Sequence, residues 1–418
     1  MIAPVLDIKV LTEWLTSLPL VPPTPAYIYD GDVISGRVIS LQHSLGGLLD
    51  ISFAIKSNPN PAILRMMAQI TPWLDASSWA EVQRALDAGK PPDRITYSGP
   101  GKRARELVAA VAQGVPVVVE SLDEIEQLTD ICLAAGRSHA VLVRVNPDHV
   151  PRGFGASMSG KPSQFGIDED TARAAIDMID ASGVLKLNGL HVYTGSNALS
   201  PDPIVENFTN MARLFLMLSD NGTRHLNKLI FGAGFGIPYH AGQGPLDVVE
   251  VCDRIMPILE GLRRHPGLKE ASFILEMGRW LVGPAGALVT QVLSRKRSRG
   301  QDIAVCDAGF NNHLAACGMM GSTFRKDYPI VLLSEAADQP ADTIKLTGPL
   351  CTSIDSLAGP LNLGPVKRGD FIAILQSGAY GLTASPTRFI SHPDPIEILH
   401  VKGTYKDITE HKLNHVIT

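Results

Sequence analysis

The stretch PVVVESLDEIEQLTDICLAAGRSHAVLVRV (116–145) shows the pattern that decides the fold of this chain. A β-rich run at 116–120 is followed by a helical pattern that ends in Gly136, and a second apolar run occupies 140–145. The helical pattern begins after Ser121 and ends in glycine, as the capping preferences of helices require. The stretch therefore predicts one strand–helix–strand unit of a parallel sheet.

The same alternation continues on both sides of this unit. Helical patterns separate eight β-rich runs, which lie at 51–56, 72–76, 94–98, 116–120, 140–145, 188–193, 228–231 and 273–276. Eight strands that alternate with helices over this length match the size and strand count of an α/β fold of the (β/α)₈ TIM-barrel type. An open, doubly wound α/β sheet is the alternative that the alternation leaves open.

The pattern changes after about residue 280, where strand-like runs follow one another with few helical windows between them. These runs are ALVTQVLSRKR (287–297), DIAVCDAG (302–309), YPIVLLSEA (328–336), DTIKLTGPLC (342–351), GDFIAILQSG (369–378) and PIEILHVKG (395–403). They predict a C-terminal β domain, a barrel or a sandwich. The early strand AYIYD (26–30) precedes the barrel and is a candidate to pair with it.

The composition excludes several classes of protein. The 418 residues include 37 Lys and Arg against 42 Asp and Glu, which gives a net charge of −5. This balance argues against a nucleic-acid-binding protein, and a hydrophobic content of 45% argues against a disordered chain. No run of 18 apolar residues is present, and the first residues lack a basic region. We therefore expect neither a membrane span nor a signal peptide.

The cysteines indicate a reducing compartment. An odd number without a CxxC pair favours free thiols over a disulfide framework, so we expect a cytoplasmic protein. The five are Cys132, Cys252, Cys306, Cys317 and Cys351.

Chemistry-bearing residues follow the predicted barrel strands. Active sites of TIM barrels lie at the carboxyl ends of the strands, so we examined the residues just past each run. Polar or glycine residues gather there: Lys56, Asp75, Ser77, Ser78, Arg144, Asn146, His191, Ser196, the loop GAGFG (232–236), Glu276, Gly278 and Arg279.

Lys56 closes the apolar run ISFAIK (51–56). Burial disfavours an ammonium, so a desolvated lysine can act as a neutral nucleophile toward an aldehyde. The alternative is a lysine at a strand end whose charged group reaches solvent.

The remaining candidates each have a structural alternative. The backbone N–H groups of GAGFG can bind a phosphate, or the loop is only a tight turn. Glu276 can hold a protonated ring nitrogen and Arg279 an anion, or the two form a buried ion pair. His191 is a flat ring for stacking, or a core histidine. A lysine, a phosphate loop, a carboxylate and an imidazole together indicate a site for pyridoxal 5′-phosphate (PLP).

These residues resemble the motifs of the fold-type III PLP decarboxylases, the ornithine/diaminopimelate decarboxylase family, over about residues 24–402. GAGFG is similar to the family's GGGFG with Ala233 in place of a glycine, and EMGR is similar to EPGR with Met277 in place of proline. The other segments are FAIKSNP (53–59), DASS (75–78) with Glu81, HVYTGSN (191–197), CDAGFNNHL (306–314), GPLCTSID (348–355) and SGAYG (377–381).

The resemblance implies an alanine-racemase-like barrel over 35–278 and a β domain made of 1–34 and 279–418. It implies that Lys56 is the Schiff-base lysine and that no metal is needed. The cofactor neighbours that it implies are Asp75, His191, Ser196, Gly232, Gly234, Gly236, Glu276, Gly278, Arg279 and Tyr380.

The resemblance also gives Cys351 a role that its sequence context alone does not. Members of the family are head-to-tail homodimers in which this cysteine reaches the partner's site and protonates Cα after CO₂ leaves. Without the family, Cys351 is a small buried apolar residue. The substrate contacts that the resemblance implies are Arg279, Thr352, Asp355 and Tyr380.

Two departures from the family bear on the substrate. Diaminopimelate decarboxylases carry an Arg and a Tyr after DAGxN, whereas HLAACGMMG (313–321) has neither. An acidic residue follows the cysteine in the family, but Thr352 stands here. A buried distal charge needs a partner. We therefore expect a biosynthetic α-decarboxylase of an amino acid or a conjugated amino acid, such as a glutamyl group tethered to a carrier protein.

Arg325 and Lys326 can meet the anionic phosphopantetheine arm of such a conjugate, or they are ordinary solvated cations. The alternatives are a diaminopimelate or ornithine decarboxylase, an amino-acid racemase, and a catalytically silent paralogue that binds a protein partner.

Overall fold

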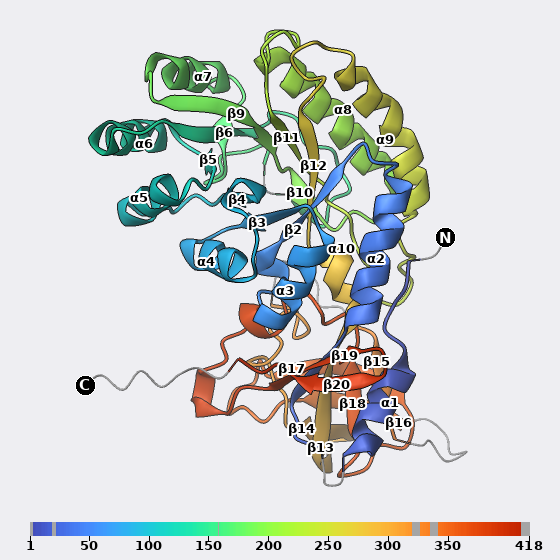
Figure 1. The fold of residues 1–418 in the computed structure, drawn as a ribbon. Helices are drawn as coiled ribbons and strands as arrows, with labels where there is room; N and C mark the ends of the chain where they lie inside the picture. The colour runs from blue at the N-terminus through green and yellow to red at the C-terminus, as the bar shows by residue number, and fades with distance from the viewer. Residues whose placement is uncertain (1–2, 19–21, 158, 320–326, 335–341, 411–418) are drawn as a thin grey trace, which may run out of the picture.

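The computed structural model describes residues 3–18, 22–157, 159–319, 327–334 and 342–410. Eight parallel strands close into a barrel, and helices surround it (Figure 1). Pairing of the last strand with the first, Leu275 opposite Ile51, closes the ring, as does pairing of the fourth strand with the fifth. The strands are β2 (Asp50–Ala54), β3 (Trp73–Ala76), β4 (Ile95–Tyr97), β5 (Val117–Val119), β6 (His139–Asn146), β9 (Leu185–Val192), β11 (Lys228–Gly232) and β12 (Ser272–Met277). The expected (β/α)₈ barrel is confirmed, and the open sheet is excluded.

Local sequence explains the outer helices. In α6 (Leu122–Ala135), Ser121 accepts a hydrogen bond from the Glu124 N–H at 3.2 Å, and Gly136 ends the helix at φ +60°. This cap and this stop are the ones that the sequence predicts. The other helices around the barrel are α2 (Gly31–Ser44), α3 (Pro61–Ile70), α4 (Trp79–Asp87), α5 (Ala104–Gln113), α7 (Ala172–Ala181), α8 (Pro201–Leu218) and α9 (Val248–Arg263).

A second, mixed sheet lies below the barrel in the view of Figure 1. AYIYD forms β1 (Ala26–Asp30) in this sheet and does not pair with the barrel strands, which the sequence had left possible; the resemblance had grouped residues 1–34 with the β domain. Strand β1 pairs antiparallel with β13 and parallel with β19. The other strands are β13 (Gly286–Ser298), β14 (Gln301–Cys306), β15 (Ile330–Leu332), β16 (Asp342–Thr347), β17 (Ser356–Leu363), β18 (Phe371–Ile374), β19 (Ile396–Val401) and β20 (Thr404–Asp407).

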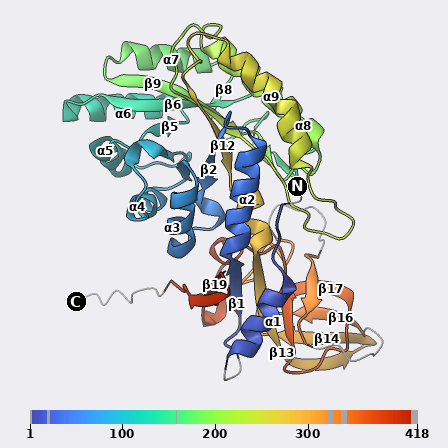
Figure 2. The same cartoon turned by 45° about the vertical axis from the view of Figure 1, so that its right-hand side comes forward.

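Burial explains the place of β1, because all five of its residues are buried. Tyr27 and Tyr29 belong to the large core that extends through the barrel. Ala26 and Ile28 belong to a smaller core beneath α1 (Ile8–Ser17), and Figure 2 shows α1 beside β1 and β13. A strand with two apolar faces is stable at the centre of a sheet that is covered on both sides.

The sequence analysis missed β17 (Ser356–Leu363), because Gly359 and Pro360 disfavour a strand interior. In the structure β17 is the edge strand of the sheet and pairs only with β16 among the described residues. Proline is tolerated at an edge because no ladder partner needs its missing N–H group.

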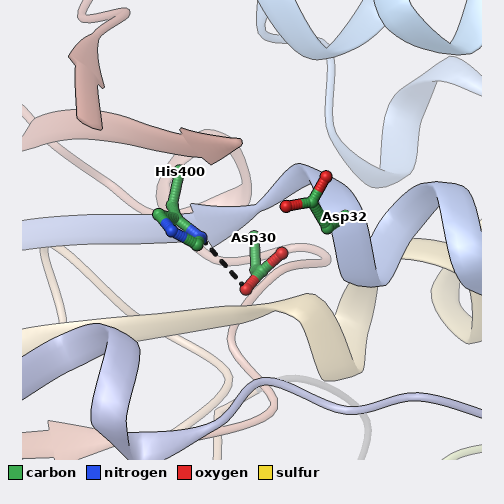
Figure 3. Close-up of side chains that lie close together, drawn as sticks. All are labelled: Asp30, Asp32 and His400. Atoms are coloured by element: carbon green, nitrogen blue, oxygen red, sulfur yellow. Dashed lines mark hydrogen bonds and ion pairs between the residues drawn. The ribbon is translucent and has the colours of Figure 1, made fainter. Parts of the chain in front are cut away.

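The junction between β1 and α2 joins the two parts of the molecule (Figure 3). Asp30 caps α2 by accepting a hydrogen bond from the Val33 N–H at 2.9 Å, and its other oxygen lies 3.2 Å from His400 Nδ1. Asp32 accepts a hydrogen bond from the Lys402 N–H at 2.7 Å. This cluster ties the start of α2 to the β19–β20 hairpin. Helix α2 contacts β19 of the second sheet and also α9 of the barrel, so it does not mark a clear boundary between the two parts. The limits 35–278 and 1–34 with 279–418 stay a prediction.

The amino end of the barrel contains a buried lysine. Lys228 is 7% exposed, and its Nζ lies 4.5 Å from the centre of the Trp73 ring and donates to the Asp93 carbonyl at 2.8 Å. Burial lowers the pKa of Lys228 to about 8. The folded chain therefore releases this proton at a lower pH than the unfolded chain does.

Stability should depend on pH through this group. Between about pH 8 and the ordinary lysine pKa, the unfolded chain binds more protons, so a rise in pH stabilises the fold. We predict that the unfolding free energy of wild type, measured relative to Lys228→Met, increases by about 2 kcal/mol from pH 7 to pH 10. Urea unfolding of both proteins at several pH values measures this difference. A difference that does not change with pH would contradict the prediction.

Candidate active site

A cavity opens at the carboxyl end of the barrel, where the polar residues were expected to gather. It contains seven of the predicted residues: Lys56, Ser196, Gly234, Glu276, Gly278, Arg279 and Tyr380. Four further residues complete its lining, and no role had been predicted for their side chains: Ala54, Tyr193, Phe235 and Met277. Tyr193 lies inside the quoted HVYTGSN segment, so its position in that motif was an available signal.

Lys56 lies just past the end of β2. The expected strand 51–56 stops at Ala54, and a single 3₁₀ turn, Ile55–Ser57, follows it. The Ser57 hydroxyl donates to the Ala54 carbonyl at 2.8 Å and stabilises this turn. The turn directs the lysine into the cavity, where its Nζ lies 5.4 Å from the centre of the Tyr193 ring.

The second sheet contributes directly to the turn that carries Lys56. The Tyr380 N–H donates to the Ser57 carbonyl at 2.9 Å, and the Asn58 amide donates to the Gly378 carbonyl at 3.0 Å. The segment SGAYG is therefore fastened against the barrel, and this contact explains how Tyr380 reaches a cavity built mainly by barrel strands.

The charge state of Lys56 differs from the sequence-based expectation. Burial lowers its pKa, but attraction by the carboxylates of Asp75 and Glu276 outweighs burial, so the pKa of Lys56 is raised. The neutral amine expected from desolvation alone is therefore wrong for the cofactor-free chain, because two acidic residues from other strands lie nearby.

Asp75 and His191 flank Glu276. Burial, together with the nearby Glu276, raises the pKa of Asp75 to about 7. Burial and the cation of Arg144 lower the pKa of His191 to about 3, so this ring is neutral. His191 Nε2 lies 2.7 Å from Glu276 Oε2. A neutral ring facing a carboxylate carries its proton on that nitrogen, which leaves Nδ1 as an acceptor.

Arg144 and Glu120 form a buried ion pair next to His191. Of the two, only Arg144 was predicted at the site. Arg144 Nη1 donates to Glu120 at 3.0 Å, and Glu120 also accepts hydrogen bonds from the Gly99 and Gly166 N–H groups. Burial raises the pKa of Glu120, but Arg144 and then Lys102 outweigh burial, so its pKa is lowered. Glu120 closes the run PVVVE, so its place at a strand end was the available signal.

The loop GAGFG follows β11 and has the backbone of a binding loop. Gly234 has φ +68°, and a Cβ atom there would overlap the Phe154 ring. Gly236 lies so close to the chain that its Cβ would be 2.6 Å from the Ala198 carbonyl oxygen, and at Gly232 a Cβ would meet Tyr193. The N–H groups of Gly234 and Phe235 donate no hydrogen bond within the described residues. They are available to an anion.

Arg279 and Glu276 do not form the ion pair that was the alternative reading. Arg279 donates from Nη1 to the Tyr239 hydroxyl at 2.7 Å, and its guanidinium lies 4.8 Å from the centre of the Tyr380 ring. Its buried Nε has no partner, and no carboxylate pairs with Arg279 among the described residues. A buried cation without a carboxylate partner favours the binding of an anion.

Seven predicted residues do not line this cavity: Asp75, His191, Gly232 and Gly236 lie around it, and Cys351, Thr352 and Asp355 belong to the β16–β17 connection. Cys351 is exposed on the β16–β17 connection, and Thr352 follows it. The two oxygens of Asp355 accept hydrogen bonds from the Phe310 and Leu350 N–H groups at 2.9 and 2.8 Å. Asp355 therefore holds the connection in place, and its expected contact with substrate stays a prediction. Arg325 and Lys326 lie outside the described residues.

The unsatisfied groups of the cavity and of two buried residues around it, Asp75 and His191, fit PLP. Asp75 Oδ2, His191 Nδ1 and Arg279 Nε are buried without hydrogen-bond partners among the described residues, and two loop N–H groups are free. Carboxylates suit a protonated ring nitrogen, the flat imidazole suits an aromatic face, and the guanidinium and loop N–H groups suit a phosphate. Lys56 supplies the amine for the aldehyde.

Comparisons with known proteins agree with this site. A family model described as pyridoxal-dependent decarboxylase, pyridoxal binding domain, matches residues 32–283. An L-glutamyl-[BtrI acyl-carrier protein] decarboxylase from Niallia circulans is 32% identical, over 92% of this chain and 90% of the relative. A diaminopimelate decarboxylase from Aquifex aeolicus is 29% identical, over 92% and 88%.

Solved structures show the same fold. The diaminopimelate decarboxylase of Helicobacter pylori, complexed with L-lysine, superposes with a TM-score of 0.83 at 27% identity and covers 95% of each chain. The family model spans more than half of the chain, and the first of these relatives exceeds 30% identity over nearly all of it. The chain is therefore a PLP-dependent carboxy-lyase and belongs to the family of pyridoxal-dependent decarboxylases.

Proposed function

We propose that this enzyme removes the α-carboxylate from a glutamyl group that is joined to a carrier protein. The observation that carries the proposal is the absence of charge in the two segments that bind a distal charge elsewhere in the family. Thr352 is neutral, the described residues 313–319 include no Asp, Glu, Lys or Arg, and His313 is fully buried against Ser377 Oγ at 3.0 Å. Burial lowers the pKa of His313 to about 3, so it is neutral as well.

The chemistry of decarboxylation makes an uncharged distal end meaningful. PLP reacts with a free α-amine, and when bound it accepts the electrons of the Cα–carboxylate bond. A tethered glutamyl group must therefore keep its α-amine and α-carboxylate and be joined through its side-chain carbonyl, which is neutral. A free diamino acid would bring a charge that needs a partner. The carrier-linked relative from Niallia circulans supports the same substrate class.

The chain's own residues prepare the site for this reaction. Asp75 and Glu276 hold a positive charge at Lys56 and at a protonated ring nitrogen. His191 is kept neutral and presents a flat face, and Glu276 orients it. Arg279, free of any carboxylate partner, receives an anion.

We also propose that two copies of the chain form a homodimer and that Cys351 delivers a proton to Cα in the partner's cavity. The support is its position, exposed and outside the cavity of its own chain. Ile354, three residues after Cys351, is 54% exposed. Phe389 is 42% exposed, and its ring centre lies 5.3 Å from that of Phe310. Asp355 ties Cys351's loop to Phe310. Such a patch is typical of a protein interface.

A cytoplasmic location is a proposal as well. All five cysteines are free thiols in the structure, which suits a reducing compartment. Within the described residues, no helix has both the length and the apolar character needed to cross a membrane.

Substitution of Gly234 tests the cofactor loop. In Gly234→Ala the methyl group meets Phe154 and the residue must hold a left-handed backbone, which costs about 1–2 kcal/mol. We predict that PLP affinity, measured by titration of the bound-cofactor absorbance, falls at least about ten-fold. The matched control is Gly242→Ala, with φ +86° and open space around it. Equal losses in the two variants would contradict the role of the loop.

The substrate class is tested by CO₂ release from the PLP-loaded enzyme. We expect release from a glutamyl group tethered to a carrier protein, and rates at least about 100-fold lower with free glutamate, ornithine, lysine or diaminopimelate, because the site offers a free distal charge no partner. Rapid release from a free diamino acid would overturn the substrate proposal and restore the simpler decarboxylase alternative. Inversion at Cα without CO₂ release would indicate a racemase.

Hybrid dimers test the shared site. Lys56→Ala and Cys351→Ala chains should each be nearly inactive alone. After mixing by reversible denaturation, random pairing places one intact site in half of the dimers, so about a quarter of the wild-type rate should return. The two variants refolded separately are the controls. An absence of recovery, with both variants dimeric and loaded with PLP, would show that Cys351 does not act across the interface.

A further inference from the structure

A second groove lies beside the active-site cavity. Residues 148–154 and 159–161, which belong to the connection that leaves β6, line it together with Glu206 of α8. The groove is open to solvent.

The groove and the cavity share a wall. In the connection, β7 (Ala156–Ser157) pairs with β10 (Gly195–Ser196), and the Ser159 hydroxyl donates to the Tyr193 carbonyl at 2.9 Å. Tyr193 and Ser196 line the cavity of Lys56, whereas Ser159 lines the groove. Phe154 lines the groove as well and packs against Gly234 of the cofactor loop. A molecule in the groove thus lies one chain segment away from the site of the reaction.

The backbone of the groove is held in place without a ligand. The side chain of Asn146, at the end of β6, accepts a hydrogen bond from the Gly160 N–H at 3.1 Å and donates to the Lys161 carbonyl at 3.4 Å. It also donates to Asp168 at 2.7 Å. These contacts fix the second side of the groove to the barrel, so a ligand does not need to order it.

The groove combines apolar side chains with two free cations. Glu206 is paired with His149 at 2.8 Å. The carboxylate of Glu206 is thus occupied by His149, and Asp148 is the other acidic residue of the lining. The cations of Arg152 and Lys161 make no hydrogen bond or ion pair within the described residues. Val150 and Phe154 supply apolar surface between the polar groups.

We propose that this groove binds the arm of the carrier protein, with Arg152 and Lys161 on its phosphodiester and Val150 and Phe154 against its carbon chain. This inference rests on the proposed carrier-linked substrate. The arm of an acyl-carrier protein is a long, largely uncharged chain with one phosphodiester at its protein end. The groove offers apolar side chains for the chain and two cations for the phosphodiester. Because the groove adjoins the cavity wall, the arm can lie in it while its acyl end reaches Lys56.

The test compares two small substrates on the PLP-loaded enzyme: the glutamyl thioester of 4′-phosphopantetheine and the same thioester of pantetheine, which lacks the phosphate. In the double variant Arg152→Ser/Lys161→Ser, KM for the phosphorylated substrate should rise about ten-fold or more, because charged contacts are lost. KM for the unphosphorylated substrate and kcat for both should stay at the wild-type values. The control is Arg105→Ser, an exposed arginine on α5 without a partner among the described residues. Equal changes for both substrates, or none, would overturn the proposal.

A binding measurement separates this proposal from the proposed function. Calorimetric titration of the PLP-loaded enzyme with 4′-phosphopantetheine alone should show binding by wild type and Arg105→Ser, and binding weakened about ten-fold in the double variant. That result would support the groove even if neither thioester released CO₂, an outcome that would refute only the substrate. No binding by wild type would overturn the groove, whatever the fate of the substrate.

Discussion

The structure depends on how a closed parallel barrel handles buried charge. All eight strands end on the same side, so residues that are distant in sequence meet there, away from bulk water. A charge in that place is stable only with a partner. Asp75 and Glu276 lie around the single amine of Lys56, and Glu120 holds Arg144. The same charged groups also serve the reaction, because they suit the binding of PLP, a charged aromatic aldehyde.

The second sheet completes the site. β1, from the N-terminal segment, joins β13 and β19 and carries the chain into the first outer helix, where Asp30 caps α2. At the other end of the domain, Tyr380 and Gly378 bond to the turn of Lys56. The position of the lysine is therefore set from both domains, and a change in the packing of the β domain is a change in the active site.

The proposed substrate rests on the absence of a charged side chain that could bind its distal end. The segment that begins at His313 and the residue after Cys351 provide no charge, and His313 is occupied with Ser377. The neutral residues at 313–319 and 352, and the groove in which Arg152 and Lys161 have no partner among the described residues, are two separate features of the structure. Both agree with a substrate that continues beyond the cavity as a tethered arm.

The amino-acid sequence by itself determined the barrel, the presence of a C-terminal β domain and the positions of Lys56, His191, Glu276 and the GAGFG loop. It did so because strand–helix periodicity and glycine loops are local properties of the chain. Only the tertiary structure decided the partners. The raised pKa of Lys56 comes from acids on other strands, and Glu120 was found only through Arg144. The tertiary structure also decided three further features: the place of β1, the edge position of β17 with its proline, and the hydrogen bonds of Asp355 to backbone N–H groups. Each of these depends on contacts between residues far apart in the chain, and local pattern does not contain them.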